Sequence, residues 1–239
     1  MFFKYTPPFP KCYKKESKPH KFCPGCGHGI ALKSLGYVID DLNISNKILI
    51  GVDIGCSLLA WDYFDLNTIQ THHGRTVPVI SGYKLCAPQM VGIAYVGDGG
   101  AYAIGLQSLL TAAHRNDPIT VIVINNTLYG MTGGQMAPTT LLGEVTTTTP
   151  NGNINTPIFG PELIKNVTTK NNFIARGIVS QPNELKNIIK DAIKFQIDKK
   201  SFSFVEILSM CPVNWKKNSQ ESLEFLEEKM AKQFKLGEI

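Results

Sequence analysis

The sequence lacks a long hydrophobic run. Its longest apolar stretches, such as Ile119–Ile124, have the length of a strand and fall far short of the roughly 20 residues that cross a membrane. The first 21 residues contain no sustained apolar core and no cleavage pattern of small residues, so we expect no signal peptide and a cytoplasmic location. We also find no internal repeat and no nucleic-acid-binding motif. These absences argue against a membrane or a nucleic acid as partner and predict a globular protein with a sizeable core.

Charge of one sign is not abundant either. The formal net charge is +5, and much of it comes from six lysines and one glutamate within residues 1–21. We interpret this segment, which includes Cys12, as a solvated basic arm; the alternative is an electrostatic patch for an acidic partner. The expected organisation is this arm, an α/β domain over residues 22–215 and a C-terminal helix over residues 216–239.

The six cysteines form no regular framework of the kind that secreted proteins use for disulfides. Cys23 and Cys26 flank a Pro-Gly turn, a spacing that suits zinc, an iron–sulfur cluster or a redox dithiol. Cys56 and Cys211 each follow an apolar strand. Four thiolates drawn from three places can hold a [4Fe–4S] cluster, and structural zinc is the alternative. Cys86 is expected to be a buried thiol.

Short β-branched runs alternate with longer helical patterns along the chain. The runs are apolar almost throughout, which is typical of strands covered on both faces by helices. The alternation predicts an α/β fold with a mainly parallel sheet flanked by helices. Strands are expected at Lys47–Ile54, Gly92–Gly97, Ile119–Asn125, Asn172–Ile178 and Phe202–Leu208, and helices at His28–Leu42, Ala101–Arg115, Pro182–Asp198 and Ser219–Lys235.

One region breaks this alternation. Residues 131–160 are rich in Gly, Thr and Pro and show neither a helical nor a strand period. A loop of this length in a compact domain is usually functional or disordered. Because it follows directly on a strand end, where open α/β sheets bind their ligands, we expect it to be functional.

A glycine turn after the second of these strands carries a carboxylate where a phosphate would normally bind. Asp98 lies between Gly97 and Gly99, and an anion beside a phosphate is repelled. A divalent cation between them removes the repulsion, and Mg²⁺ prefers carboxylate, amide and phosphate oxygens. The next strand ends in Asn125–Asn126, at the same edge of a parallel sheet. The sequence therefore predicts that Asp98, Asn126 and a nearby backbone carbonyl converge on one metal.

With these motifs in order, the chain resembles the β subunit of 2-oxoacid:ferredoxin oxidoreductases, which binds thiamine diphosphate. The resemblance covers nearly the whole length. It depends on six blocks: FCPGCGHG (Phe22–Gly29), IGCS (Ile54–Ser57), HHGRTVPVISGYK (His72–Lys84), GDGGAYAIG (Gly97–Gly105), NNTLYGMTGGQMAPTT (Asn125–Thr140) and SMCP (Ser209–Pro212).

The resemblance implies roles for individual residues. Asp98, Asn126 and the carbonyl of Leu128 would bind Mg²⁺, and His73, chosen over His72 because it precedes the Gly-Arg turn, would reach the diphosphate. The [4Fe–4S] ligands would be Cys23, Cys26, Cys56 and Cys211. The full set expected to line the cofactor is Ile54, Gly55, Cys56, Ser57, His73, Gly97, Asp98, Gly99, Gly100, Asn126, Leu128, Gly130 and Met131.

The implied activity is the oxidative decarboxylation of a 2-oxoacid to acyl-CoA and CO₂, with electrons passed through the cluster to ferredoxin. The implied partners are an obligate α subunit, which supplies the glutamate that activates the cofactor, and γ and ferredoxin-like δ subunits. Two alternatives remain open. One is a half-subunit of a non-oxidative thiamine decarboxylase, and the other is a non-catalytic iron–sulfur or zinc scaffold.

Two positions depart from the family pattern. Many members carry a second acid after the glycine turn, where this chain has Gly100, so any side-chain role there is expected to be lost. Some relatives have a lysine linked to coenzyme A at the place of Gly133, which leaves the docking of coenzyme A open. The blocks GDGGAYAIG and NNTLYGMTGGQMAPTT favour a branched-chain 2-oxoacid as substrate, then 2-oxoglutarate, then pyruvate.

Overall fold

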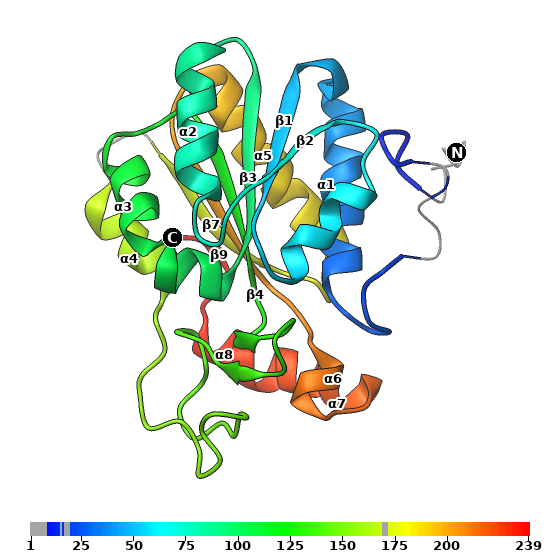
Figure 1. The fold of residues 1–239 in the computed structure, drawn as a ribbon, viewed down its shortest axis with the longest axis vertical. Helices are drawn as coiled ribbons and strands as arrows, with labels where there is room; N and C mark the ends of the chain where they lie inside the picture. Colours follow the sequence, from blue (N-terminus) through cyan, green and yellow to red (C-terminus); the bar gives the residue numbers. More distant parts are fainter. Residues whose placement is uncertain (1–8, 15, 17–19, 169–171) are drawn as a thin grey trace.

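The computed structural model describes residues 9–14, 16, 20–168 and 172–239. They form an α/β fold around a seven-stranded sheet (Figure 1). The strand order is β2-β1-β3-β4-β8-β7-β9, and every neighbouring pair is parallel except β7 and β9. The predicted α/β fold with a mainly parallel sheet is therefore confirmed. The strands are β1 (Ile48–Val52), β2 (Asn67–Gln70), β3 (Val91–Gly97), β4 (Thr120–Asn125), β7 (Phe173–Ile178), β8 (Ser203–Leu208) and β9 (Gly237–Glu238).

Helices cover both faces of the sheet. The helices α1 (His28–Leu42) and α5 (Pro182–Lys199) pack on one face, and α2 (Thr76–Cys86), α3 (Leu106–His114) and α4 (Gly160–Val167) pack on the other (Figure 1). The side chains of β4 and β8 are buried on both faces, which explains why most of their residues are apolar. After β8 the chain continues through α6 (Pro212–Trp215), α7 (Ser219–Glu224), a π-helical turn (Phe225–Met230) and α8 (Ala231–Gln233), and then forms β9. The helical stretch over residues 219–233 is thus shorter than the C-terminal helix expected over residues 216–239. None of the helices within the described ranges is long and apolar enough to span a membrane.

Several elements escaped the sequence analysis. The helix α2 contains Pro78, Gly82 and a β-branched run, all of which disfavour a helix in sequence patterns. Tertiary packing overrides this preference, because α2 contacts β1 and β3. Cys86 ends this helix and is exposed, so its expected burial is wrong. Among the other missed elements, α4, α6, β2 and β9 are short, and β2 and β9 form the edges of the sheet.

The first described residues pack against α1. Cys12 is buried, its Sγ lies 3.4 Å from the carbonyl oxygen of Gly36, and its backbone N–H donates to Asp40 at 3.1 Å. A Cβ on Gly36 would lie 2.7 Å from the ring of Pro10, so this glycine permits the close approach. The expectation that Cys12 lies on a solvated arm is therefore wrong. Several lysines of the expected arm lie outside the described residues: Lys4, Lys15 and Lys18.

The segment expected to be a long loop runs below the sheet (Figure 1). Its β6 (Gln135–Met136) forms a hairpin with β5 (Leu128–Tyr129), which directly precedes it, and it contains one isolated bridge between Thr146 and Thr149. It then continues to α4 without a further helix or strand. Buried contacts fix it to the rest of the protein, because the Thr139 hydroxyl donates to Asp98. The loop is thus part of the sheet edge where we expect the site.

A buried ion network ties α4 to the sheet on the side away from α1. Arg176 of β7 is fully buried, and its Nε donates to Glu206 of β8 at 2.5 Å. Its two terminal nitrogens donate to Glu162 of α4 at 2.6 and 2.8 Å. The hydroxyl of Tyr102 donates to the second oxygen of Glu206. Each buried charge therefore has an opposite charge and hydrogen-bond partners.

Candidate functional site

The carboxyl ends of β1, β3 and β4 meet at one edge of the sheet and surround a cavity of about 90 Å³. Parallel strands necessarily end together at one edge, so segments far apart in sequence are brought side by side here. The structure gathers all thirteen residues that were expected to line the cofactor. In the cavity wall lie Ile54, Gly55, Cys56, Ser57, His73, Gly97, Asp98, Gly99, Gly100, Asn126, Leu128, Gly130 and Met131.

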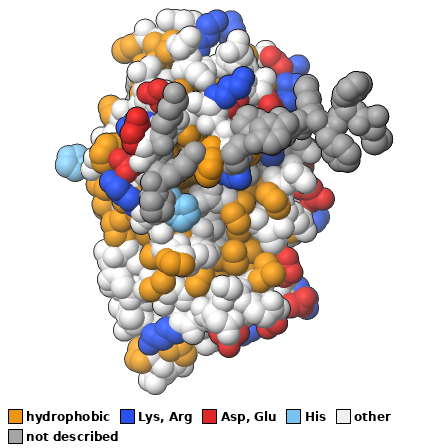
Figure 2. All heavy atoms as spheres, turned by 90° about the vertical axis from the view of Figure 1, so that its right-hand side faces the viewer, with side chains coloured by type: hydrophobic (Ala, Val, Ile, Leu, Met, Phe, Trp, Pro, Cys, Tyr) orange, Lys and Arg blue, Asp and Glu red, His pale blue; other side chains and the backbone are white. Residues whose placement is uncertain are grey.

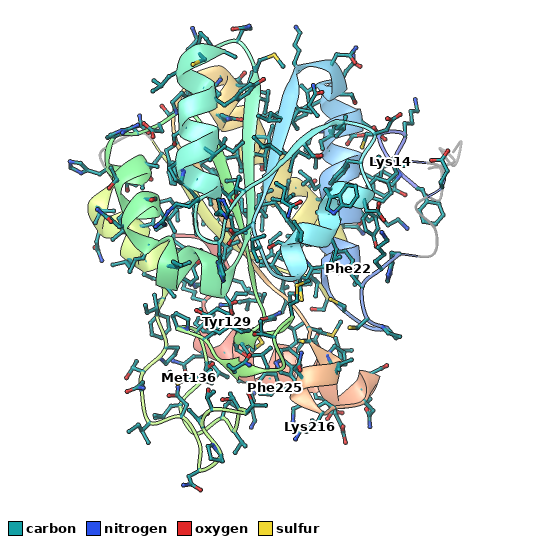
Figure 3. All side chains as sticks on the ribbon, in the orientation of Figure 1. Lys14, Phe22, Tyr129, Met136, Lys216 and Phe225 are labelled. Carbon is teal, nitrogen blue, oxygen red and sulfur yellow. The ribbon has the colours of Figure 1, made fainter. Side chains whose placement is uncertain are left out.

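The glycine turn is needed because neighbours occupy the space of its missing side chains. A Cβ on Gly99 would lie 2.0 Å from the ring of Tyr129, so the β5–β6 hairpin packs directly on the turn. Figure 3 shows Tyr129 below the lower edge of the sheet, on the side of the hairpin. A Cβ on Gly100 would lie 1.8 Å from Oδ2 of Asp53. Alanine at either position would force the cavity wall apart.

Asp98 is the buried anion of this cavity, with 3 % of its surface exposed. One carboxylate oxygen accepts a hydrogen bond from the backbone N–H of Gly99 at 2.8 Å, and the other accepts one from the hydroxyl of Thr139. Burial raises the pKa of Asp98 to about 7, and these hydrogen bonds only partly oppose the shift. A carboxylate held in this environment is stabilised by a cation, and its oxygens suit Mg²⁺.

The second expected oxygen ligand lies at the end of the adjacent strand. Asn126 is buried, and its side-chain oxygen accepts a hydrogen bond from the N–H of Leu128 at 3.3 Å. Between them, Thr127 has a φ of 62°, an uncommon conformation for a β-branched residue. This sharp turn directs both Asn126 and Leu128 toward the cavity. The donor set of carboxylate, amide and backbone carbonyl oxygens fits a magnesium ion, and their role as ligands stays a prediction.

The four expected cluster ligands approach one another beside the cavity. Burial raises the pKa of the Cys26 thiol to about 12, and the proximity of Cys211, Cys56 and Cys23 adds to the shift. A Cβ on Gly130 would lie 3.2 Å from Sγ of Cys56 and 3.6 Å from Sγ of Cys211. Four soft sulfur donors suit an iron–sulfur cluster.

In the described part of the chain, however, no three His, Cys, Asp or Glu side chains are placed to hold a metal ion. The assignment of Cys23, Cys26, Cys56 and Cys211 as ligands therefore stays a prediction. Cys56 belongs both to the expected cluster ligands and to the residues expected to line the cofactor. It begins the 3₁₀ helix Cys56–Asp62 and lines the cavity.

Of the two adjacent histidines, only His73 lines the cavity. Its side chain is 35 % exposed, and its Nδ1 lies 3.5 Å from Oδ2 of Asp53. His72 is exposed and does not belong to the cavity wall. The location agrees with the choice of His73 in the sequence, and a contact with diphosphate stays a prediction.

Sequence reasoning missed several residues of the site. His28 lines the cavity, its Nδ1 lies 2.8 Å from the hydroxyl of Tyr95, and burial lowers its pKa to about 3. Its ring is therefore neutral at physiological pH. The sequence did contain a signal for His28, because this residue lies in the block FCPGCGHG, but only the cysteines of that block were interpreted. Asp53 was missed as well, although it immediately precedes the block IGCS.

A larger apolar cavity of about 860 Å³ lies on the other side of the thiols, against α1. Figure 2 shows hydrophobic side chains gathered on this face of the molecule. Its wall includes the aromatic side chains of Phe22, Tyr37 and Tyr63, together with Cys26. Phe22 lies at the end of α1 nearest the sheet edge (Figure 3). No sequence motif pointed to this cavity, because its wall combines residues from distant segments.

Comparison with known proteins finds thiamine pyrophosphate enzymes and subunits of 2-oxoacid oxidoreductases. A family model described as "Thiamine pyrophosphate enzyme, C-terminal TPP binding domain" matches residues 53–207. The ketoisovalerate oxidoreductase subunit VorA of Methanothermobacter thermautotrophicus is 40% identical over 89% of this chain and 46% of its own length. The 2-oxoglutarate synthase subunit KorB of Methanothermobacter marburgensis is 34% identical over 92% of this chain and 78% of its own. The chain spans about half the length of the VorA subunits that it matches.

A solved structure shares the fold. It is a 2-oxoglutarate:ferredoxin oxidoreductase from Magnetococcus marinus with 2-oxoglutarate, coenzyme A and succinyl-CoA bound. The TM-score is 0.82 at 28% sequence identity, and the match covers 95% of this chain and 75% of the other. The 2-oxoacid:ferredoxin oxidoreductase subunit beta of Saccharolobus solfataricus is 36% identical over 80% of this chain and 62% of its own.

Proposed function

Because the chain belongs to the β subunits of 2-oxoacid:ferredoxin oxidoreductases, a group of thiamine pyrophosphate enzymes, we propose that it carries the cofactor of such a complex. The reaction is the oxidative decarboxylation of a 2-oxoacid to acyl-CoA and CO₂, with electrons delivered to ferredoxin. The cytoplasm, where thiols stay reduced, is the compartment that suits this chemistry.

The observation that carries this proposal is the buried carboxylate of Asp98 in a cavity walled by glycine turns and the tips of parallel strands. Asp98, Asn126 and the carbonyl of Leu128 hold a Mg²⁺ ion, which neutralises the diphosphate. Thr139 fixes the orientation of the Asp98 carboxylate through its hydrogen bond. When bound, thiamine diphosphate supplies a nucleophilic carbon and an electron sink for the decarboxylation.

The four thiols supply the ligands of the proposed electron acceptor. Cys23, Cys26, Cys56 and Cys211 hold a [4Fe–4S] cluster. Cys56 lies in the wall of the cavity, and its Sγ and that of Cys211 both lie near Gly130, so Cys56 would contact both the cofactor and the cluster. This feature favours an oxidative reaction over a non-oxidative thiamine decarboxylase, which needs no set of four cysteines. It also favours an enzyme over a non-catalytic scaffold, which needs no cofactor cavity.

This chain works only within a complex. An α subunit completes the cofactor site with a second α/β domain, and γ and ferredoxin-like δ subunits continue the electron path. The name of each curated relative as a subunit supports this part of the proposal. The ketoisovalerate oxidoreductase subunit of M. thermautotrophicus is 40% identical and the 2-oxoglutarate synthase subunit of M. marburgensis 34%, which supports a branched-chain 2-oxoacid as first candidate and 2-oxoglutarate as second.

An assay of the purified complex tests the function. We expect coenzyme A-dependent reduction of ferredoxin or of an artificial viologen acceptor with 2-oxoisovalerate, weaker reduction with 2-oxoglutarate and the weakest with pyruvate. CO₂ release without reduction of the acceptor would instead identify a non-oxidative decarboxylase. Inactivity toward the whole panel, with thiamine diphosphate and Mg²⁺ present, would contradict the proposal.

Replacing Cys26 with Ser is expected to remove most of the cluster iron from the complex, because a hydroxyl is a poor substitute for a thiolate ligand. In an anaerobic preparation, we expect the iron attributable to this chain to fall from four atoms, the content of a [4Fe–4S] cluster, to fewer than one. The visible absorbance that dithionite bleaches should fall in parallel. Cys86→Ser is the matched control, since Cys86 is exposed and belongs to no expected ligand set. Full iron content in the Cys26 variant, or zinc in place of iron, would contradict the assignment.

A further inference from the structure

Asp53 is an unassigned acid at the tip of β1, where it adjoins the cofactor cavity. It is fully buried, and its backbone N–H donates to the carbonyl of Tyr95 at 3.2 Å. Its Oδ1 accepts a hydrogen bond from the N–H of Gly74 at 2.8 Å. Its Oδ2 has no hydrogen-bond partner among the described residues, and neither has Nδ1 of His73, which lies 3.5 Å away. Two buried polar atoms of complementary type therefore face each other just beyond hydrogen-bond distance.

The geometry around the pair is fixed on two opposite sides. Gly74, with a φ of 70°, follows His73 directly and is itself held by the Asp53 carboxylate, so the two residues share one anchored turn. On the opposite side, a Cβ on Gly100 would lie 1.8 Å from Oδ2 of Asp53 and 3.4 Å from Cε1 of His73. The absence of a side chain at residue 100 is therefore what makes room for the carboxylate.

This arrangement gives Gly100 a structural role that differs from the one expected from the sequence. A carboxylate was expected to be lost from the glycine turn because residue 100 is not an acid. The structure instead shows the carboxylate of Asp53, from the neighbouring strand, in the space that a side chain on residue 100 would fill. The site thus has a second acid in addition to Asp98, and this acid faces a histidine.

We propose that Asp53 is a positioning residue for His73, which it holds so that the ring binds the diphosphate of the cofactor through Nε2. This inference depends on the proposed function. A carboxylate oxygen and a phosphate oxygen both accept hydrogen bonds, so a ring that bridges them donates from both nitrogens. With Nδ1 directed at Asp53, Nε2 is left for the cavity that His73 lines. The ring then places a fixed donor on the diphosphate, and Asp53 keeps it from rotating away.

The test is a double-mutant cycle on the whole complex, freed of cofactor, with binding measured by calorimetry at saturating Mg²⁺. We expect His73→Gln and Asp53→Asn each to weaken the binding of thiamine diphosphate about tenfold, since a hydrogen bond to a charged group contributes roughly 1.5 to 3 kcal/mol. The double variant should bind no more weakly than His73→Gln alone, because Asp53 acts only through His73. His72→Gln is the matched control and should bind as the wild type does.

A second probe separates positioning from general damage. Thiamine, which lacks the diphosphate, should bind equally well to the wild type and to the Asp53, His73 and double variants. Gly100→Ala, which displaces the carboxylate from the opposite side, should weaken the binding of thiamine diphosphate as Asp53→Asn does.

Three results would overturn the role of Asp53: additive losses in the double variant, an equal loss of thiamine binding, or wild-type affinity in Asp53→Asn. A wild-type complex that binds no thiamine diphosphate would overturn the proposed function itself, a distinct outcome.

Discussion

Replacing Asp98 with Ala is expected to weaken the binding of thiamine diphosphate by at least roughly 100-fold, or about 2.7 kcal/mol. The residual affinity should no longer respond to Mg²⁺. The reason is that Asp98 is the only carboxylate among the three expected magnesium ligands, so its loss removes the charge that joins the metal to the sheet edge. Calorimetric titration of the cofactor-free complex over a range of Mg²⁺ concentrations measures both effects.

The same substitution should not destabilise the metal-free protein. Burial raises the pKa of Asp98 to about 7, which means that its ionised form is penalised in the absence of a cation. Ala relieves that penalty, although it also removes the hydrogen bonds to Gly99 and Thr139. Asp41→Asn, at a partly exposed carboxylate of α1, is the control. If Asp98→Ala left the affinity unchanged at limiting Mg²⁺, the metal would have to bind elsewhere.

Replacing Arg176 with Leu is expected to lower the free energy of unfolding by about 3 to 5 kcal/mol, because it leaves Glu206 buried without its cation. Glu206 is fully buried, and its remaining partner, Tyr102, carries no charge. Glu162 suffers less, since its side chain is 36 % exposed and can be solvated by water. Urea denaturation, analysed with a common slope for all variants, measures the loss.

A double variant tests whether the unpaired charge of Glu206 causes the loss of stability. Combining Arg176→Met with Glu206→Gln removes both buried charges while keeping an acceptor for Tyr102, so it should recover about half of the lost stability. Lys190→Leu, which removes a surface cation paired with Asp41 at 3.6 Å, should change the stability by less than about 1 kcal/mol. A loss below about 1 kcal/mol in Arg176→Leu would show that the buried network is not needed for stability.

The parts of the fold that the sequence predicted correctly are those with strong local signals. The helix α1 has the expected bounds His28–Leu42, and β4 and β8 differ from their expected ranges by one residue. Runs of buried β-branched residues identify central strands because both faces are covered. The convergence of Asp98 and Asn126 on one cavity followed from topology, since parallel strands end together.

The elements that were missed depend on contacts between distant segments. The helix α2 has a poor helical sequence, and packing against β1 and β3 supplies the stabilisation that local propensity lacks. Cys12 was placed on a solvated arm because its neighbours are lysines, whereas Gly36, more than twenty residues away, creates its buried position. Asp53 was overlooked for a similar reason, because its significance comes from Gly100 and His73 on other segments.

The exposed thiol of Cys86 offers an attachment point away from the functional edge. Cys86 ends α2, and β3 begins at Val91, so the sulfur lies near the amino end of a strand whose opposite tip carries Asp98. The other exposed thiol is Cys23, which the cluster would occupy in the assembled protein. A maleimide should therefore label Cys86 selectively, and a dye or an electrode linker placed there would report on turnover without obstructing the cavity.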